Sequence, residues 1–246
     1  MNLIKLKYFQ IKILNLLGKT KIIKLMKHQL SKFAVLLLVG FSVVACKKAK
    51  NETEAKDAEV VSEIEVTGLR YITELDKSTI TWKGFAPTKS HNGYIKISEG
   101  YLTLNDNKIS GGNFIIDMTT IEDLSLEDEQ YNAKLEGHLS SDDFFNVKKH
   151  PFSAFTITNI QEKDGKSMIH GNLSIKGIKK NIRFPASIKV NGDEVRLKSE
   201  SFTIDRTEWD IKFRSGKFFQ DLKDKLINDE IEFKVDVVAK RKDTIK

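Results

Sequence analysis

The chain has 246 residues, 30% of them charged, and its formal net charge is +7. Met1 to Ala45 contains eight Lys and no Asp, Glu or Arg, which leaves 33 of the 41 Lys and Arg residues against all 34 acidic residues in the rest of the chain. Because the main part of the chain is almost neutral, its charge argues against nucleic-acid binding, and the single Cys excludes an intramolecular disulfide.

The N-terminal region has the pattern of a bacterial lipoprotein signal. The apolar run Phe33 to Ala45 follows a basic stretch and is too short to cross a bilayer as a helix, which needs about 20 apolar residues. Val43-Val44-Ala45-Cys46 resembles a lipobox, whose cysteine carries the lipid. We therefore expect residues 1–45 to be a signal peptide, with translation starting at Met26, and Cys46 to anchor the protein to a membrane on the periplasmic side of a bacterial cell envelope.

Residues 46–67 predict a flexible tether. The stretch 47–65 is rich in Lys, Glu and Ala and lacks aromatic residues, so it buries too little apolar surface to offset the entropy of ordering it. Residues 68–246 are sufficient for one domain with its own core.

This domain contains a series of segments in which apolar and polar residues alternate, which is the pattern of half-buried strands. The segments are 80–82, 94–97, 102–104, 113–118, 155–157, 169–175, 182–190, 195–197 and 231–237. Turn signals follow several of them, at Asn105-Asp106-Asn107, Lys163-Asp164-Gly165, Lys176-Gly177 and Asn191-Gly192-Asp193. Eight or more strands joined by short turns predict an all-β antiparallel sandwich or barrel.

One region has helical spacing instead. Tyr131, Leu135 and Leu139 lie four residues apart within 127–139, which predicts a helix. The polar run 140–143 before Phe144 predicts the start of a short second helix, and Pro151 returns the chain to extended structure. We expect these helices beside one edge or mouth of the sheet.

Several motifs in this order resemble the YceI-like family of lipocalin-like, polyisoprenoid-binding proteins. The most specific is the run from His138 to Phe155, with Phe144-Phe145 and His150-Pro151 at its centre. The resemblance also includes Trp82-Lys-Gly, His91-Asn-Gly, the stretch from Gly111 to Met118, Gly171-Asn-Leu-Ser-Ile-Lys-Gly177, Phe184-Pro185 and Phe202-Thr-Ile-Asp205-Arg206.

The resemblance implies an extended eight-stranded antiparallel barrel with one or two short helices, which holds a long apolar lipid such as a polyprenyl phosphate or a quinone. It implies no enzymatic activity and no cofactor besides the lipid ligand, and it is compatible with a homodimer. On resemblance and apolar facing, we expect the tunnel wall to include Trp82, Phe114, Ile116, Phe144, Phe145, Phe155, Leu173, Phe184, Phe202 and Trp209.

The polar candidates leave alternatives open. His91 and Arg206 are possible head-group contacts, but a turn hydrogen bond for His91 and a structural ion pair for Arg206 are alternative roles. The His spacing is unlike that of a zinc site, and no familiar catalytic motif occurs. Two other functions remain: an envelope interaction lipoprotein with a filled barrel, and an enzyme that processes a lipid pyrophosphate with His91 and Asp205 as acid and base.

Overall fold

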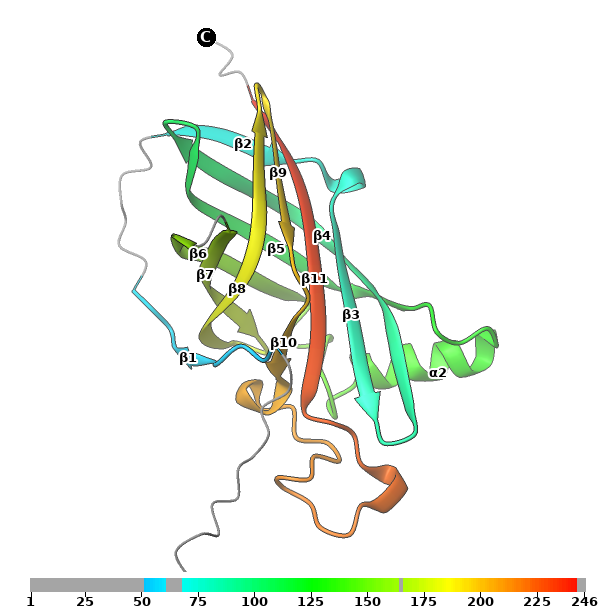
Figure 1. The fold of residues 1–246 in the computed structure, drawn as a ribbon. Helices are drawn as coiled ribbons and strands as arrows, with labels where there is room; N and C mark the ends of the chain where they lie inside the picture. The colour runs from blue at the N-terminus through cyan, green and yellow to red at the C-terminus, as the bar shows by residue number, and fades with distance from the viewer. Residues whose placement is uncertain (1–50, 61–67, 164–165, 243–246) are drawn as a thin grey trace, which may run out of the picture. The chain divides into compact units, whose positions relative to one another are not determined.

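The computed structural model describes residues 51–60, 68–163 and 166–242 (Figure 1). The predicted signal peptide, its start site and Cys46 lie outside these residues. The strands are β1 (Lys56–Asp57), β2 (Leu69–Thr73), β3 (Thr79–Ala86), β4 (Lys89–Asn105), β5 (Lys108–Asp123), β6 (Phe152–Lys163), β7 (Lys166–Ile175), β8 (Ile178–Asn191), β9 (Glu194–Ser199), β10 (Phe202–Asp205) and β11 (Glu230–Arg241). One α-helix, α2 (Glu129–Ser140), and three 3₁₀ turns, η1 (Leu75–Lys77), η2 (Arg206–Trp209) and η3 (Lys223–Lys225), complete the described part.

Eight of these strands close into an antiparallel barrel. Strands β3 to β8 pair in sequence order, β8 continues to β9, β9 pairs with β11, and β11 pairs with β3. Closure removes the unpaired edges that an open sheet would expose. The predicted eight-stranded antiparallel barrel is therefore confirmed.

Two positions of the barrel wall are each shared by two short strands. β2 and β3 both lie between β4 and β11 and are separated by η1, while β9 and β10 pair in succession along β11. Several predicted turns join the other strands, and their residues adopt the left-handed conformation that tight hairpins require, as at Asn107 (φ 60°) and Gly177 (φ 77°). The connections from β2 to β3 and from β9 to β10 therefore lie part-way along the barrel wall.

The helix α2 lies at one end of the barrel, which we call the mouth end (Figure 1). Asp128 caps α2 by accepting hydrogen bonds from the Gln130 and Tyr131 N–H groups. The prediction of a short second helix after residue 140 is wrong. Ser141 is already extended and Asn146 takes a positive φ of 46°, so the chain forms consecutive turns that bring Phe144 and Val147 inward. None of the helices in the described ranges is long and apolar enough to cross a membrane.

The segment Asn51 to Glu59, which we call the strap, differs from the expected flexible tether. Its Thr53 N–H donates to the Thr203 carbonyl (2.7 Å), and Thr53 Oγ1 accepts from the Arg183 N–H (3.0 Å). β1 then pairs with β8, so the strap fills the gap that opens where β10 separates from β8. The composition of this segment does not reveal the contact, because backbone groups and one Thr hydroxyl make it and these do not depend on apolar side chains.

Candidate ligand-binding site

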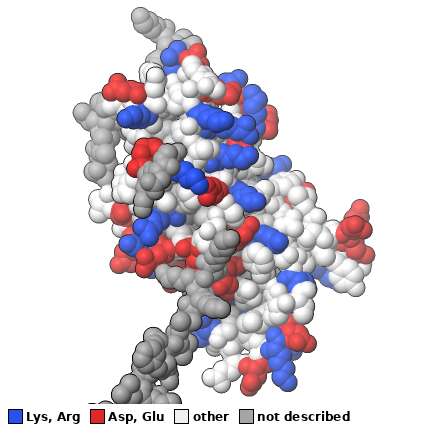
Figure 2. Space-filling model, viewed as in Figure 1, with Lys and Arg blue, Asp and Glu red and all other residues white. Residues whose placement is uncertain are grey.

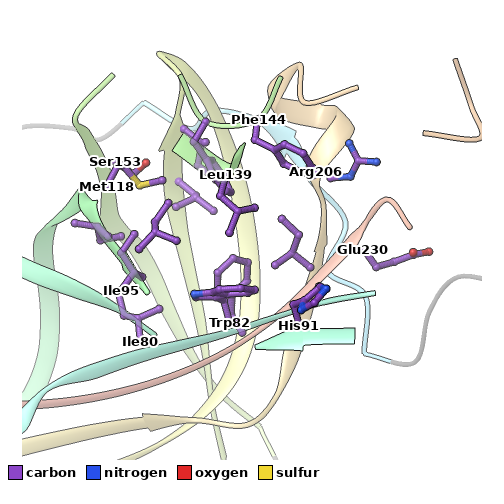
Figure 3. Close-up of a pocket in the computed structure, with 18 of the residues that line it drawn as sticks. Ile80, Trp82, His91, Ile95, Met118, Leu139, Phe144, Ser153, Arg206 and Glu230 are labelled. Atoms are coloured by element: carbon purple, nitrogen blue, oxygen red, sulfur yellow. The ribbon is translucent and has the colours of Figure 1, made fainter. Parts of the chain in front are cut away.

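The barrel encloses a cavity of about 390 Å³, within the range of pockets that hold small apolar ligands (Figure 3). Its inner part is lined by the inward-facing residues of the strands, such as Ile80, Ile97, Ile157 and Val235, and Ser153 is the one polar liner there. All other polar liners come from the mouth end, namely Lys89, His91, His138, Arg206, Arg214, Asp224, Lys225, Asn228 and Glu230. The cavity is thus apolar inside and polar at one end.

Nine of the ten residues expected in the tunnel wall line this cavity. They come from six strands and from the turns after α2: Trp82, Phe114, Ile116, Phe144, Phe145, Phe155, Leu173, Phe184 and Phe202. The alternation that predicted the strands explains the agreement, because every second side chain of a barrel strand points inward.

Four Phe rings form a continuous row along the wall. Phe155 lies 5.6 Å from Phe184, which stacks on Phe202 at 4.4 Å, and Phe202 lies 6.0 Å from Phe233, measured between ring centroids. Gly171 makes room for this row, since a Cβ at its position would lie 2.2 Å from the Phe155 ring. The glycine of the recognised motif therefore determines where an aromatic wall residue lies.

Sequence reasoning missed part of the wall. Ile231, Phe233, Val235 and Val237 of β11 all line the cavity, although their alternation had already predicted a strand. Leu135 and Leu139 cover the mouth end from α2, whereas Tyr131, the third residue of the same helical spacing, is 63% exposed. These β11 residues could have been identified from the sequence, because the alternate apolar residues of a barrel strand are the ones that face inward.

Trp209 is the exception among the predicted wall residues. It is fully buried in η2 outside the cavity lining, and its Nε1–H donates to the Leu173 carbonyl (3.2 Å). η2 directs this side chain into the packing behind the wall, because the alternation of β10 ends at Asp205. Trp209 therefore supports the wall without being part of its inner surface.

Trp209→Phe is expected to lower the free energy of unfolding by about 1–2 kcal/mol, because this fully buried side chain loses volume and its hydrogen bond to the Leu173 carbonyl. Affinity for an apolar ligand should stay unchanged, since the residue does not line the cavity. Urea unfolding measures the first quantity and ligand titration the second. A loss of affinity at unchanged stability would contradict this assignment.

Arg206 lines the mouth end but serves mainly as a structural residue. Its guanidinium donates to the carbonyls of Ile211 (2.6 Å), Ile227 (3.0 Å) and Asn228 (3.0 Å) and lies 3.4 Å from Asp229 Oδ1. These contacts tie the loop between η2 and β11 to the barrel.

Asp205 is not the main partner of Arg206. It accepts hydrogen bonds from Thr207 and from the Lys217 ammonium group. Burial alone would raise the pKa of Asp205, but these hydrogen bonds hold it below its usual value. Of the two alternatives for Arg206, the structure favours the ion pair, with Asp229 as the nearer carboxylate.

His91 lies at the mouth in a hydrogen-bonded chain. Its Nδ1 is 2.9 Å from Ser125 Oγ, and the Ser125 hydroxyl donates to the buried carboxylate of Asp123 (2.7 Å). The Ser125 oxygen must therefore accept from Nδ1–H, which leaves Nε2 as an acceptor on a ring that lines the cavity. This geometry is compatible with both roles considered for His91, a head-group contact and a hydrogen bond that stabilises a turn. Figure 3 shows its ring beside Trp82, with Arg206 and Glu230 on the same side of the cavity and Ile80, Ile95 and Met118 opposite.

The stability of the protein is expected to fall as the pH decreases below about 6.5, the ordinary pKa of His. Burial lowers the pKa of His91, against the opposing charge of Asp123, and burial also lowers the pKa of His170, against that of Glu59. Because the unfolded chain binds these protons more readily, protonation favours unfolding.

Thermal unfolding at pH 7.5 and 5.0 tests this expectation. The difference between the two midpoints should be smaller in the His91→Gln/His170→Gln variant than in the wild type, and each single variant should account for part of the change. Equal differences in the wild type and the double variant would refute the assignment.

Within residues 51–60, 68–163 and 166–242, no three His, Cys, Asp or Glu side chains lie close enough together to hold a metal ion. The polar groups at the mouth are joined instead to one another and to backbone carbonyls, as the contacts of Arg206 and Asp205 show.

Comparison with known proteins gives consistent results. The curated relatives include a UPF0312 protein of Pectobacterium carotovorum, 39% identical over 64 residues, and Protein YceI of Salmonella arizonae, 33% identical over 63 residues. Each match spans 26% of this chain and 33% of the relative, so the chain matches about a third of the length of these proteins.

Two solved structures share the fold. The crystal structure of BcnA from Burkholderia cenocepacia has a TM-score of 0.54 and 23% identity, and it covers 68% of this chain and 99% of its own. A polyisoprenoid binding domain from Saccharophagus degradans has a TM-score of 0.52 and 9% identity, covering 71% of this chain and 99% of its own. The model of the YceI-like domain matches residues 71–239, which is most of the chain, and the protein therefore belongs to the YceI-like family.

Proposed function

We propose that this protein binds the apolar chain of an isoprenoid-type lipid, a polyprenyl phosphate or a quinone, inside its barrel at the bacterial cell envelope. The carrying observation is the separation of polarity along the cavity: the inner wall is apolar, whereas the polar liners other than Ser153 belong to the mouth end. A long apolar tail with one polar end matches this separation. The fold that the chain shares with a polyisoprenoid binding domain supports the same ligand class.

The tail provides most of the affinity in this proposal. Each buried CH₂ contributes about 0.8 kcal/mol, so an isoprene unit contributes roughly 3 kcal/mol before the cost of ordering the chain is subtracted. A neutral hydrogen bond at the mouth adds only about 1 kcal/mol. The mouth residues therefore set the orientation and the head-group preference, with His91 Nε2 available to accept a hydrogen bond from a hydroxyl group.

The proposal includes no catalysis and no cofactor besides the lipid. Asp205, the acid or base of the enzymatic alternative, is paired with Lys217 and Thr207. The proposed location is the periplasmic side of the envelope, with the protein anchored to the membrane through a lipid on Cys46. The cavity favours this function over the alternative of a filled barrel that acts only through its surface.

Intrinsic fluorescence tests the proposal, because the chain has two Trp residues and one of them lines the cavity. In the Trp209→Phe variant, Trp82 is the sole reporter. A quinone with an isoprenoid tail should quench its emission saturably, whereas the same quinone ring without a tail should have no saturable effect.

The Trp82→Phe variant is the matched control, since its remaining reporter, Trp209, lies behind the wall. Its quenching should be weaker at every ligand concentration. Equal quenching in the two variants, or saturation by the tail-less ring, would contradict binding of the tail inside the barrel. A change in the mass of the recovered lipid would instead favour the enzymatic alternative.

A further inference from the structure

The loop between η2 and β11 carries two exposed aromatic side chains at the mouth end. Phe218 and Phe219 are 50% and 49% exposed, and other residues of the same loop, Arg214, Asp224 and Lys225, line the mouth of the cavity. Figure 1 shows this loop projecting beyond the barrel at the end where α2 lies. The aromatic pair is therefore adjacent to the opening through which an apolar ligand would pass.

The two Phe residues lie on a fixed turn. Their N–H groups both donate to the carbonyl of Ser215 (3.2 and 3.0 Å), and Ser215 itself is fully buried. The neighbouring Lys217 is held by its ion pair with Asp205 of β10. An adjacent pair of exposed aromatic side chains on an ordered turn is the kind of apolar surface that contacts a partner.

The loop places cations beside the exposed aromatic pair. Its residues 210–229 contain five Lys or Arg and four Asp residues, a net charge of +1, and Lys212 and Lys217 are ion-paired with Asp210 and Asp205. Lys223 and Lys225 are exposed, and Lys212 lies 5.0 Å from the Phe218 ring centroid. In Figure 2 the lobe at the lower end of the molecule carries uncharged surface next to charged side chains. Aromatic residues flanked by Lys and Arg are typical of surfaces that enter the head-group region of a bilayer.

The strap brings the N-terminal side of the chain to the same region. Asn51 accepts a hydrogen bond from the Thr203 N–H, and Glu52 lies close enough to Lys217 for their charges to interact. Only four residues lie between Cys46 and Asn51, and the five extended residue steps from one to the other span at most about 18 Å.

This reach is shorter than the barrel. Thr203 pairs with Glu232, and Arg241 at the far end of β11 lies nine residue steps further along, which corresponds to about 30 Å of strand. A lipid on Cys46 therefore cannot bring the far end of an upright barrel to the membrane surface, but it can bring the mouth end there.

We infer that Phe218, Phe219 and the surrounding cations dock the mouth end of the barrel onto an anionic lipid bilayer, with the strap holding this orientation relative to an anchor on Cys46. The mouth then faces the membrane, so a lipid would pass between bilayer and cavity without crossing water. This docking goes beyond ligand binding and does not depend on which lipid occupies the barrel.

The test uses the full lipidated protein in vesicles of phosphatidylcholine and phosphatidylglycerol. Cys46 is the only Cys of the chain and would be blocked by its lipid, so Phe218→Cys and Lys108→Cys each introduce a single free thiol for an environment-sensitive fluorophore. Lys108 is exposed at the far end of the barrel and serves as the matched control. A nitroxide carried on the lipid acyl chains should quench the label at 218 several times more strongly than the label at 108.

Three results would overturn the docking proposal. The first is equal or stronger quenching of the label at 108, and the second is a label at 218 shielded from both aqueous iodide and the nitroxide lipid, which indicates a protein partner. The third is an intact mass without acyl groups on Cys46. Extraction of the same samples reports on ligand binding separately: absence of an isoprenoid would contradict the proposed function while leaving the docking result valid.

Discussion

Phe155→Glu is expected to weaken isoprenoid binding by more than about 100-fold, equivalent to about 3 kcal/mol. Phe155 lines the cavity and packs between Gly171 and Phe184 in the row of Phe rings. A carboxylate at this position would lose its hydration when an apolar tail enters, and burying an unpaired charge costs several kcal/mol. In the empty barrel the cavity can admit water, so we expect the fold to persist.

Asn159→Glu is the matched control for this substitution. It introduces the same charge on the same strand, but residue 159 is exposed on the outside of the barrel. Isothermal titration with a short isoprenoid alcohol measures both affinities, and circular dichroism verifies the fold. Equal affinities in the two variants would show that the tail does not occupy the barrel.

Arg206→Met is expected to lower the free energy of unfolding by about 3–5 kcal/mol, the largest stability effect of any single substitution considered. Removing the guanidinium leaves three carbonyl groups without the hydrogen bonds that it donates, and it leaves the carboxylate of Asp229 without its nearest cation. Arg206→Lys should recover only part of this loss, because one ammonium group cannot reproduce the planar fork of donors.

The control for Arg206 is Arg183→Met on β8, whose side chain is exposed. It should change stability by less than about 0.5 kcal/mol, as surface substitutions usually do. Urea unfolding followed by circular dichroism gives all three values. If Arg206→Met changed the free energy of unfolding only slightly but abolished ligand binding, Arg206 would instead be a contact of the ligand head group.

The barrel could be predicted from the sequence because the same alternation determines both strand formation and side-chain facing. The run from Ile231 to Val237 shows this most clearly, since its four apolar residues all line the cavity and alternate strictly with charged residues. The motif residues Gly171 and Phe155 were recognised separately, and their contact across two strands became visible only in the structure.

What could not be predicted depends on contacts between distant backbone segments. The strap is held by carbonyl and N–H groups of Thr203 and Arg183, which no composition of residues 51–59 reveals. Trp209 was misplaced because η2 interrupts the alternation of β10. For Arg206 the sequence left two roles open, a head-group contact and an ion pair. Its three carbonyl acceptors could not be predicted, because they lie in a loop without a periodic pattern.

Native mass spectrometry with organic extraction, applied to the protein purified from its own envelope, tests the central claim most directly. We predict one polyprenyl or quinone molecule per barrel, absent from the Phe155→Glu variant and retained in Asn159→Glu. A wild-type barrel that is empty and also fails to take up added isoprenoids would contradict the account and favour a function carried by its surface.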